Sequence, residues 1–176
     1  QIHFYDLDGI DDITTYNIPA SWYICQAPTN TYRLYVAGEK TPFDAKGGQI
    51  NRYDGDGNWT RIDNKPGFTD LDTLSLRVTC IAVHPDDHDK VWVSLGGFFD
   101  GQKVYYSSNG GDSWTNLSGS LPNLPILSLV VDANGNLYAG GDDGIFFRGA
   151  GWADWKPFYN GIPRVPVTDL ILTSNN

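Results

Sequence analysis

Aspartates set close together are the residues of this sequence whose types and spacing could do chemistry. They occur in the segment HPDDHD, in an adjacent pair and singly near the C-terminus, as Asp86, Asp87, Asp89, Asp142, Asp143 and Asp169. Two carboxyl groups held roughly 5–9.5 Å apart can act as general acid and as base or nucleophile. The sequence does not fix that separation, and aspartates that merely form turns are the alternative interpretation. We therefore assign no catalytic residue from the sequence.

A set of oxygen ligands lies in the segment DGDGN. Asp54, Asp56 and Asn58 alternate along it as the ligands of a calcium loop do, and the segment DLDGIDD near the N-terminus echoes the pattern. A calcium loop also needs a carboxylate several residues further on, where Asp63 is available but no Glu occupies the bidentate position. Two hypotheses stay open, a calcium site and a tight turn without metal, and no other cofactor is expected.

Histidine and cysteine give weaker signals. His84 and His88 are four residues apart but enclose Pro85 in an expected turn, so their spacing does not favour a zinc site. Cys25 and Cys80 allow one disulfide or two thiols. The glycine motifs of nucleotide-binding loops and of serine hydrolases are absent from the sequence.

Aromatic side chains are the candidate binding residues. Phe98 and Phe99 stand together in the segment GGFFDGQ, which is not repeated elsewhere in the chain, and Trp152 lies in another expected loop. Loops carry binding residues more often than the elements they connect. We predict that Phe98, Phe99 and Trp152 form a sugar-stacking or protein-binding face. A contact of the Phe98–Phe99 loop with a part of the protein outside this chain is the alternative. Asp169, on an expected inner strand, is a further candidate for binding.

The composition indicates the elements that must position these residues. The chain has 176 residues, with 20 Asp, a single Glu (Glu39), 20 Gly and no Met. Asp and Gly favour turns over helices, whereas an aromatic content of 14% and many β-branched residues favour strands. The net charge of −9, without a basic stripe, argues against nucleic acid and anionic membranes as partners. No apolar run approaches the roughly 18 residues of a membrane span. Because the chain starts at Gln1, we expect a processed protein or a piece of a longer one.

An internal repeat organises the expected strands. Residues 103–131 align without a gap with residues 144–172, at an offset of 41, and aromatic, Gly, Trp and Pro positions coincide. Weaker copies centre on Asp54 and Asp8. The four anchor positions are Ile13, Trp59, Trp114 and Trp155. Their spacings of 46, 55 and 41 residues are close to the length of one four-stranded propeller blade.

The repeat predicts strands joined by turns and no helix of note. The strands are expected near residues 2–5, 21–26, 33–37, 48–53, 58–62, 78–83, 90–95, 103–107, 113–117, 126–131, 136–140, 144–148, 154–158 and 167–172.

One turn carries a specific motif. The segment SSNGGDSW, residues 107–114, resembles the Asp-box or BNR repeat, Ser-x-Asp-x-Gly-x-Ser/Thr-Trp, with Asn109 in place of the Asp. The resemblance implies a structural turn between the third and fourth strands of a blade, in which short polar side chains and glycines close the turn and the Trp packs between blades. The structural positions that it implies are Ser107, Asn109, Gly110, Gly111, Ser113, Trp114, Asp54, Trp59, Asp8 and Trp155.

The whole chain resembles a run of Asp-box β-propeller blades, as found in sialidases, xyloglucan-active glycoside hydrolases, sortilin-type receptors and a photosystem assembly factor. Its second half is most similar to secreted bacterial BNR-repeat proteins. The resemblance implies an all-β fold, a partial β-propeller of about three to four four-stranded antiparallel blades. We expect a single domain over 1–176, with repeat units of about 14–59, 60–114 and 115–155 and a split blade at the termini. Closed propellers usually have 4–8 blades, so other chains or the remainder of a larger propeller are expected partners.

The function implied by the resemblance is that of a non-catalytic, secreted or cell-surface module, a scaffold or binding protein for protein or polysaccharide, with no nucleic-acid binding and no membrane insertion. The alternative is a fragment of a xyloglucanase- or sialidase-like glycoside hydrolase whose catalytic residues lie partly outside this chain. A sialidase-like site would require three arginines and a Tyr–Glu pair. Glu39 is the single Glu of the sequence, so it alone could supply the Glu of that pair. An acidic pair facing one cleft would favour the enzyme, and carboxylates confined to turns would favour the scaffold.

Overall fold

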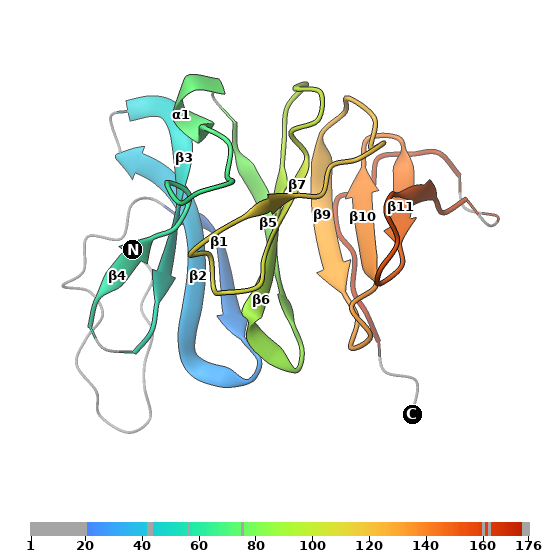
Figure 1. Ribbon diagram of the computed structural model, residues 1–176. Coiled ribbons are helices and arrows are strands. Elements are labelled where there is room, and N and C mark those ends of the chain that lie inside the picture. The colour runs from blue at the N-terminus through green and yellow to red at the C-terminus, as the bar shows by residue number, and fades with distance from the viewer. Residues whose placement is uncertain are drawn as a thin grey trace.

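Three four-stranded antiparallel sheets stand side by side along the chain (Figure 1). The computed structural model describes residues 21–41, 44–55, 57–74, 76–159, 161 and 163–173. The first sheet contains β1 (Ser21–Ala27), β2 (Asn30–Thr41), β3 (Asp44–Tyr53) and β4 (Trp59–Arg61). The second contains β5 (Val78–His84), β6 (Asp87–Leu95), β7 (Val104–Ser107) and β8 (Thr115–Asn116). The third contains β9 (Ile126–Val131), β10 (Leu137–Gly141), β11 (Gly144–Arg148) and β12 (Lys156–Pro157).

Each sheet is a simple meander, in which every strand pairs with its neighbours in sequence. The first strands of the three sheets, β1, β5 and β9, lie next to one another. Three meanders packed face to face with their first strands adjacent are successive blades of a β-propeller, which confirms the predicted all-β partial propeller. We call the sheets blades 1, 2 and 3. The short helix α1 (Leu71–Leu74) lies in the connection from blade 1 to blade 2.

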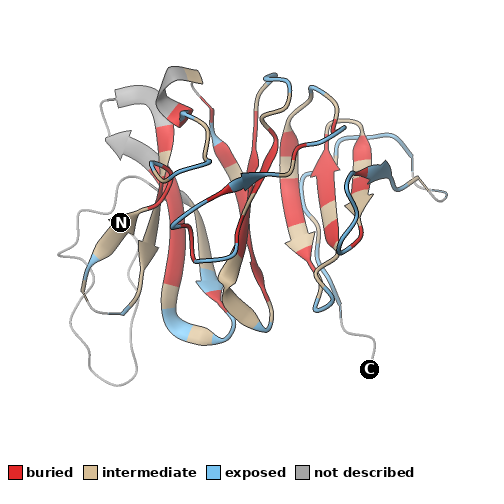
Figure 2. Ribbon diagram, in the orientation of Figure 1, coloured by how far each residue is buried: buried red, intermediate tan, exposed pale blue. Residues whose placement is uncertain are grey.

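Two apolar cores lie between the blades (Figure 2). Strand β6 of the middle blade contributes to both, because successive side chains of a strand point to opposite faces. Val91 and Val93 pack in the core between blades 1 and 2, whereas Trp92, between them in sequence, packs in the core between blades 2 and 3. The unbroken apolar run of this strand therefore reflects burial on both faces.

The ends of the blades differ from the sequence prediction. Strands β8 and β12 have two residues each, shorter than the strands expected over 113–117 and 154–158. The Trp114 amide explains the first difference, since it donates to the Pro66 carbonyl at 2.8 Å instead of joining the ladder. The strand expected over 2–5 lies outside the described residues.

The strand predicted over 167–172 is wrong, because the structure assigns no strand there. The segment does lie against blade 3, where the Val167 amide donates to the Gly141 carbonyl at 3.0 Å. An inner strand forms its ladder with the second strand of its own blade, and no such strand follows within the described residues. Among all the residues that the structure describes, no helix is long and apolar enough to cross a bilayer.

Candidate functional site

The connections between strands gather at two opposite edges of the blades. Figure 1 shows the β1–β2, β5–β6 and β9–β10 turns at the lower edge, which we call the turn edge. The turns from third to fourth strands reach the same edge, because antiparallel strands alternate in direction. The β6–β7 and β10–β11 connections lie at the upper edge, together with the links between blades, and we call it the loop edge.

The 107–114 turn is closed by its own side chains. The amides of Asn109 and Gly111 donate to the Ser107 hydroxyl oxygen at 3.2 and 2.8 Å. The Asn109 side-chain oxygen accepts the Ser113 amide at 2.9 Å, and its amide nitrogen donates to the Ser113 hydroxyl at 2.9 Å. Gly110 and Gly111 have φ of +68° and +94°. These contacts give the turn a fixed shape that a neighbouring blade can recognise.

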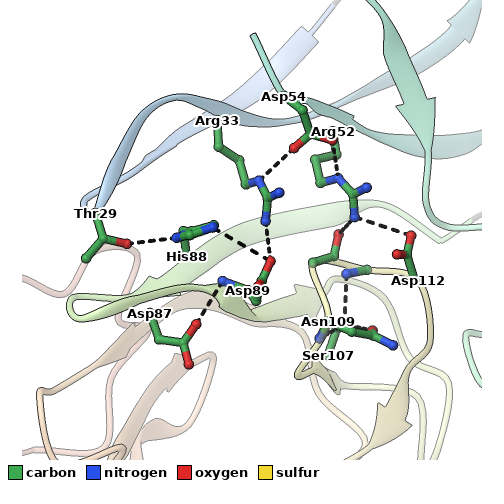
Figure 3. Close-up of polar contacts among 12 residues, drawn as sticks. Thr29, Arg33, Arg52, Asp54, Asp87, His88, Asp89, Ser107, Asn109 and Asp112 are labelled. Atoms are coloured by element: carbon green, nitrogen blue, oxygen red, sulfur yellow. Dashed lines mark hydrogen bonds and ion pairs between the residues drawn. The ribbon is translucent and has the colours of Figure 1, made fainter. Parts of the chain in front are cut away.

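Two arginines of blade 1 bind blade 2 at this turn and at the strand beside it (Figure 3). Arg52, on β3, donates from Nη1 to the Gly110 carbonyl at 2.7 Å and lies 3.3 Å from Asp112. Arg33, on β2, pairs with Asp89 of blade 2. The two guanidinium groups share Asp54, whose oxygens accept from Arg33 Nε at 2.7 Å and from Arg52 Nε at 2.9 Å. The cluster is an inter-blade clamp of alternating charges.

The clamp continues along the β5–β6 turn through hydrogen bonds. The Tyr35 hydroxyl donates to the His88 carbonyl at 2.8 Å, and the Thr29 hydroxyl lies 3.2 Å from His88 Nδ1. Burial raises the pKa of Tyr35 to about 12, which keeps its phenol protonated as this donor. His88 therefore contacts blade 1 through both its ring and its carbonyl.

Two of the candidate calcium ligands, Asp54 and Asp63, are hydrogen-bonded to other groups of the protein. Both oxygens of Asp54 accept guanidinium N–H groups. Asp63, the further carboxylate, accepts the Ile50 amide at 2.9 Å and a bidentate pair from Arg61, Nε to Oδ1 at 3.0 Å and Nη2 to Oδ2 at 2.7 Å. Asp56 lies outside the described residues, so the choice between a calcium site and a turn without metal stays a matter of prediction. Within the described ranges, no three His, Cys, Asp or Glu side chains gather where they could hold a metal.

The tryptophans at the start of the fourth strand make the same contact in two blades. We call Trp59, Trp114 and Trp155 the fourth-strand tryptophans. The indole N–H of Trp114 donates to the Ile62 carbonyl at 2.9 Å, and that of Trp155 donates to the Leu117 carbonyl at 2.7 Å. Each thereby joins its own blade to the end of the preceding one. Asp8, which the repeat aligns with Asn109 of the 107–114 turn, lies outside the described residues.

The loop edge exposes an aromatic pair on a fixed loop. Phe98 is 66% exposed and Phe99 is also exposed. Beneath them the buried Lys103 donates from Nζ to the Gly97 carbonyl at 2.8 Å and to the Asn123 side-chain oxygen at 3.1 Å. Burial lowers the pKa of Lys103. Sequence reasoning missed Lys103, because a single lysine carries no pattern.

Trp152 lies away from this pair. It is 41% exposed in the turn between β11 and β12, at the turn edge of blade 3, with its ring 5.3 Å from that of Phe147 and the Lys156 ammonium 4.7 Å above it. Phe98 and Phe99 belong to blade 2 and the opposite edge. The structure therefore does not bring the three aromatic candidates onto one face.

The inner strands carry two thiols, and one of them, Cys80, lies near Asp169. Both Cys25 and Cys80 are free, which decides between the two alternatives left by the sequence. The Tyr23 hydroxyl lies 3.1 Å from Cys80 Sγ, which donates to the Leu129 carbonyl at 3.3 Å. Burial raises the pKa of Cys80, and the nearby charge of exposed Asp169 adds to that effect. Protonated thiols of this kind are poor nucleophiles.

The paired carboxylates stay at separate edges. Asp86, Asp87 and Asp89 lie in or beside the β5–β6 turn, and Asp142–Asp143 form the β10–β11 turn at the other edge. The hydrogen bond and charge of Arg164 lower the pKa of Asp143, with Arg164 Nε at 2.9 Å from Asp143 Oδ1. A general acid needs a raised pKa. These groups lie in turns or at the strand ends beside them.

A small hollow lies at the link from blade 1 to blade 2. Its volume is about 270 Å³, and its lining is Arg61, Asp63, Asn64, Lys65, Phe68, Thr69, Asp70 and Leu71. The Arg61 guanidinium is engaged by Asp63. The lining offers polar contacts without a pair of unengaged carboxylates.

Comparisons with known proteins place the fold among β-propellers. The chain is similar to an ancestral GH74 enzyme (17% identity, TM-score 0.59, 81% of this chain and 20% of that one). It is also similar to PorZ of Porphyromonas gingivalis, a surface component of the type-IX secretion system (18% identity, TM-score 0.58, 87% of this chain and 22% of that one). A third similar structure is the GH74 xyloglucanase of Xanthomonas campestris (22% identity, TM-score 0.54, 79% of this chain and 20% of that one).

At these identities the likeness concerns the fold. The chain spans about a fifth of the length of the solved structures it matches. No family model matches the sequence. No curated protein matches it significantly.

Proposed function

We propose that this chain is a non-catalytic stretch of a larger Asp-box β-propeller, in a secreted or cell-surface protein, and that it serves as a scaffold or binding module for protein or polysaccharide. The observation that carries the proposal is the aromatic face of blade 3. On blade 2 the rings of Trp92 and Tyr106 stack at 4.8 Å, and blade 3 covers Trp92. Tyr138 and Phe147 form the equivalent cross-strand pair on blade 3, at 5.0 Å.

This pair faces away from blade 2. Leu137 and Phe146, its sequence neighbours, pack in the core between blades 2 and 3, and side chains alternate along a strand. Phe158, whose ring lies 5.8 Å from that of Tyr138, is 39% exposed. An aromatic face of this kind on a soluble protein marks an interaction surface, and a further blade is the partner with the matching shape.

The engaged carboxylates support a non-catalytic role. Asp54, Asp89 and Asp143 are all bound by arginines. Binding would then use the exposed pair Phe98 and Phe99, whose loop Lys103 holds in place. Because such a loop loses little entropy on binding, it suits a recognition role.

The open face of blade 3 is tested with the 176-residue chain in solution. We expect self-association in light scattering and binding of the dye anilinonaphthalene sulfonate, both reduced in Tyr138→Ser and Phe147→Ser. Phe98→Ser is the matched control, since it removes an exposed aromatic ring from the other edge and leaves the association unchanged. A monodisperse 19.5 kDa chain that binds no dye would overturn the proposal.

The binding role is tested with a glycan array and a panel of cell-surface proteins. For a ligand that binds the natural chain, we expect binding to be lost in Phe98→Ala and in Phe99→Ala and to be unchanged in Trp152→Ala. A loss in Trp152→Ala alone would move the binding surface to the turn edge.

A fragment of a glycoside hydrolase is the second candidate. The observation that favours it is the presence of Asp142 and Asp143 at the same edge as Phe98. Its test is the release of reducing ends from xyloglucan, which the scaffold proposal expects to be absent. Release that disappears in Asp142→Asn or Asp143→Asn would establish the enzyme instead.

A further inference from the structure

The hollow at the link from blade 1 to blade 2 is lined by residues of one continuous segment, 61–71. Trp114 of blade 2 holds this segment at two points. Its backbone amide donates to the Pro66 carbonyl at 2.8 Å, and its indole N–H donates to the Ile62 carbonyl at 2.9 Å. Gly67 approaches so closely that a Cβ there would lie 1.9 Å from the Trp114 carbonyl oxygen. The hollow therefore has a fixed shape before a ligand enters, which lowers the entropy lost on binding.

Phe68 supplies the aromatic part of the lining. The centroid of its ring lies 4.6 Å from that of Tyr105 and 4.9 Å from that of Trp114. These two contacts fix the orientation of the Phe68 ring, and Phe68 stays partly exposed at the hollow. The face of an aromatic ring carries partial negative charge, which attracts C–H groups that neighbouring oxygens polarise. A ligand that presents such C–H groups therefore stacks favourably on Phe68.

Arg61 and Asp63 form the fixed polar part of the lining. Arg61 donates to both oxygens of Asp63, from Nε at 3.0 Å and from Nη2 at 2.7 Å. The Ile50 amide donates to the same carboxylate at 2.9 Å. The Asp63 side chain is 4% exposed, whereas that of Arg61 is 33% exposed. The buried carboxylate thus orients the guanidinium plane at the wall of the hollow, as bidentate pairs do.

The lining has no net charge. It carries two cationic and two anionic side chains, those of Arg61, Lys65, Asp63 and Asp70. Because their charges cancel, neither an anion nor a cation gains a net attraction from the lining. The exposed Asn64 adds an amide that donates and accepts hydrogen bonds, and the Lys65 ammonium adds donors. Hydroxyl groups match such a mixed set, since each of them both donates and accepts.

We propose that this hollow binds one neutral pyranose ring, with a C–H face of the sugar stacked on Phe68 and its hydroxyl groups hydrogen-bonded to Asn64 and Lys65. The volume of about 270 Å³ lies below the roughly 300–1,000 Å³ of sites for drug-sized ligands, so the hollow admits one ring and not a longer chain. The inference goes beyond the proposed function, because the site lies outside both the blade 3 face and the Phe98–Phe99 loop and requires no further blade.

The hollow and the Phe98–Phe99 loop share supporting residues. The carbonyl of Leu71, which lines the hollow, accepts the Leu76 amide at 3.1 Å, and a Cβ on Gly97 would lie 3.4 Å from Leu76 Cδ2. Helix α1, which begins at Leu71, and the β6–β7 connection both lie at the loop edge in Figure 1. Two sources of the same sugar chemistry fit this arrangement, a free monosaccharide and the terminal unit of a chain that continues over the loop.

Titration of the 15N-labelled 176-residue chain with methyl pyranosides tests the proposal. The probes are the methyl glycosides of glucose, galactose, mannose and xylose, and Asn64→Asp identifies the Asn64 side-chain amide signals. With at least one probe we expect these signals and the Lys65 amide to shift, with a Kd on the order of 1 mM. The ring protons of the bound sugar should shift upfield, because they lie in the ring current of Phe68. Asn64 and Lys65 signals that stay unmoved with every probe would overturn the proposal.

Two variants at the rim of the hollow test the polar contacts. Asn64→Ala and Lys65→Met are each expected to weaken binding of the probe about threefold to tenfold. The matched controls, Asn134→Ala and Lys90→Met, remove the same types of side chain near the turn edge and should leave binding unchanged. An unshifted Trp114 indole signal checks that the segment keeps its place. Equal affinity of Asn64→Ala, Lys65→Met and the natural chain would overturn the proposal.

A linear hexasaccharide of the pyranose that binds separates the two sources. Binding at least tenfold tighter than that of the methyl glycoside, with the gain lost in Phe98→Ser, would assign the hollow to the end of a polysaccharide chain. Equal affinity of the two probes would assign it to a free sugar. Asn64 and Lys65 signals that move with N-acetylserinamide and with no pyranoside would assign the hollow to a peptide and overturn the proposal. The proposed function fails on a separate observation, a chain that binds no dye and does not self-associate, so the two failures are distinguishable.

Discussion

Arg52 and Gly110 join blade 1 to blade 2 through one hydrogen bond of 2.7 Å from the guanidinium to the carbonyl. A Cβ on Gly110 would lie 2.7 Å from that same Arg52 nitrogen. The glycine is thus required for the φ of +68° and also for the space that the arginine occupies. The turn and its partner blade depend on each other, and this dependence can be tested at neighbouring positions.

Gly111→Ala is expected to destabilise the protein more than Gly151→Ala. Both glycines have positive φ, +94° and +77°, so both substitutions carry a backbone cost of about 1–2 kcal/mol. Only at Gly111 would the new Cβ meet a side chain, with Ile62 Cδ1 at 2.6 Å, which adds about 1–3 kcal/mol of overpacking. Urea denaturation measures the difference, and equal midpoints for the two variants would contradict it.

Arg52→Met is expected to cost about 1–3 kcal/mol of unfolding free energy, because it leaves a carboxylate and a carbonyl without their charged donor. Its side chain is 12% exposed and joins Asp54, Asp112 and Gly110. Arg164→Met is the matched control, since Arg164 is 62% exposed and pairs with Asp143 at the surface, where ion pairs contribute about 0–1 kcal/mol. Thermal and urea unfolding of both variants provide the comparison, and a larger effect at Arg164 would refute the clamp.

The sequence predicts those features that repeat locally. The offset of 41 residues placed the strands of blades 2 and 3, and the SSNGGDSW segment predicted the turn whose hydrogen bonds Ser107 and Asn109 supply. Propeller blades are built from nearest neighbours in sequence, so a local pattern carries most of their geometry.

Contacts between blades were not predictable in the same way. Arg33 and Arg52 belong to strands whose spacing says nothing of Asp89 or of the Gly110 carbonyl, which come from another blade. The strand expected over 167–172 failed for a related reason, since its apolar pattern matched an inner strand but a ladder needs a partner strand.

Cys25 is expected to react slowly with iodoacetamide. Burial raises the pKa of its thiol from 9.0 to about 11, so at pH 8 its thiolate fraction is about a hundredfold lower than that of a free thiol. The rate should rise about tenfold per pH unit until the pH approaches 11. Mass spectrometry of the Cys80→Ser variant isolates this residue, and a rate equal to that of free cysteine at pH 8 would rule out the buried thiol.

Calcium is expected to leave the unfolding temperature unchanged. Both oxygens of Asp54 already bind arginines, and a divalent cation would have to displace them. Differential scanning calorimetry with 5 mM CaCl2 and with EDTA measures the effect. An unfolding temperature that rises with Ca²⁺ in the natural sequence, but not in Asp54→Asn, would instead establish the calcium site.

Lys103→Met is expected to loosen the Phe98–Phe99 loop without unfolding blade 2. The methionine keeps an apolar stem in the buried position but loses the hydrogen bonds from Nζ to Gly97 and Asn123. The Gln102 amide, which donates to the Phe99 carbonyl at 3.3 Å, should then exchange with solvent severalfold faster, because local opening no longer breaks the lysine contacts. Lys156→Met, which removes an exposed ammonium above Trp152, is the control and should leave this exchange unchanged. Exchange at Gln102 that is the same in Lys103→Met as in the natural sequence would show that the loop is held by its backbone alone.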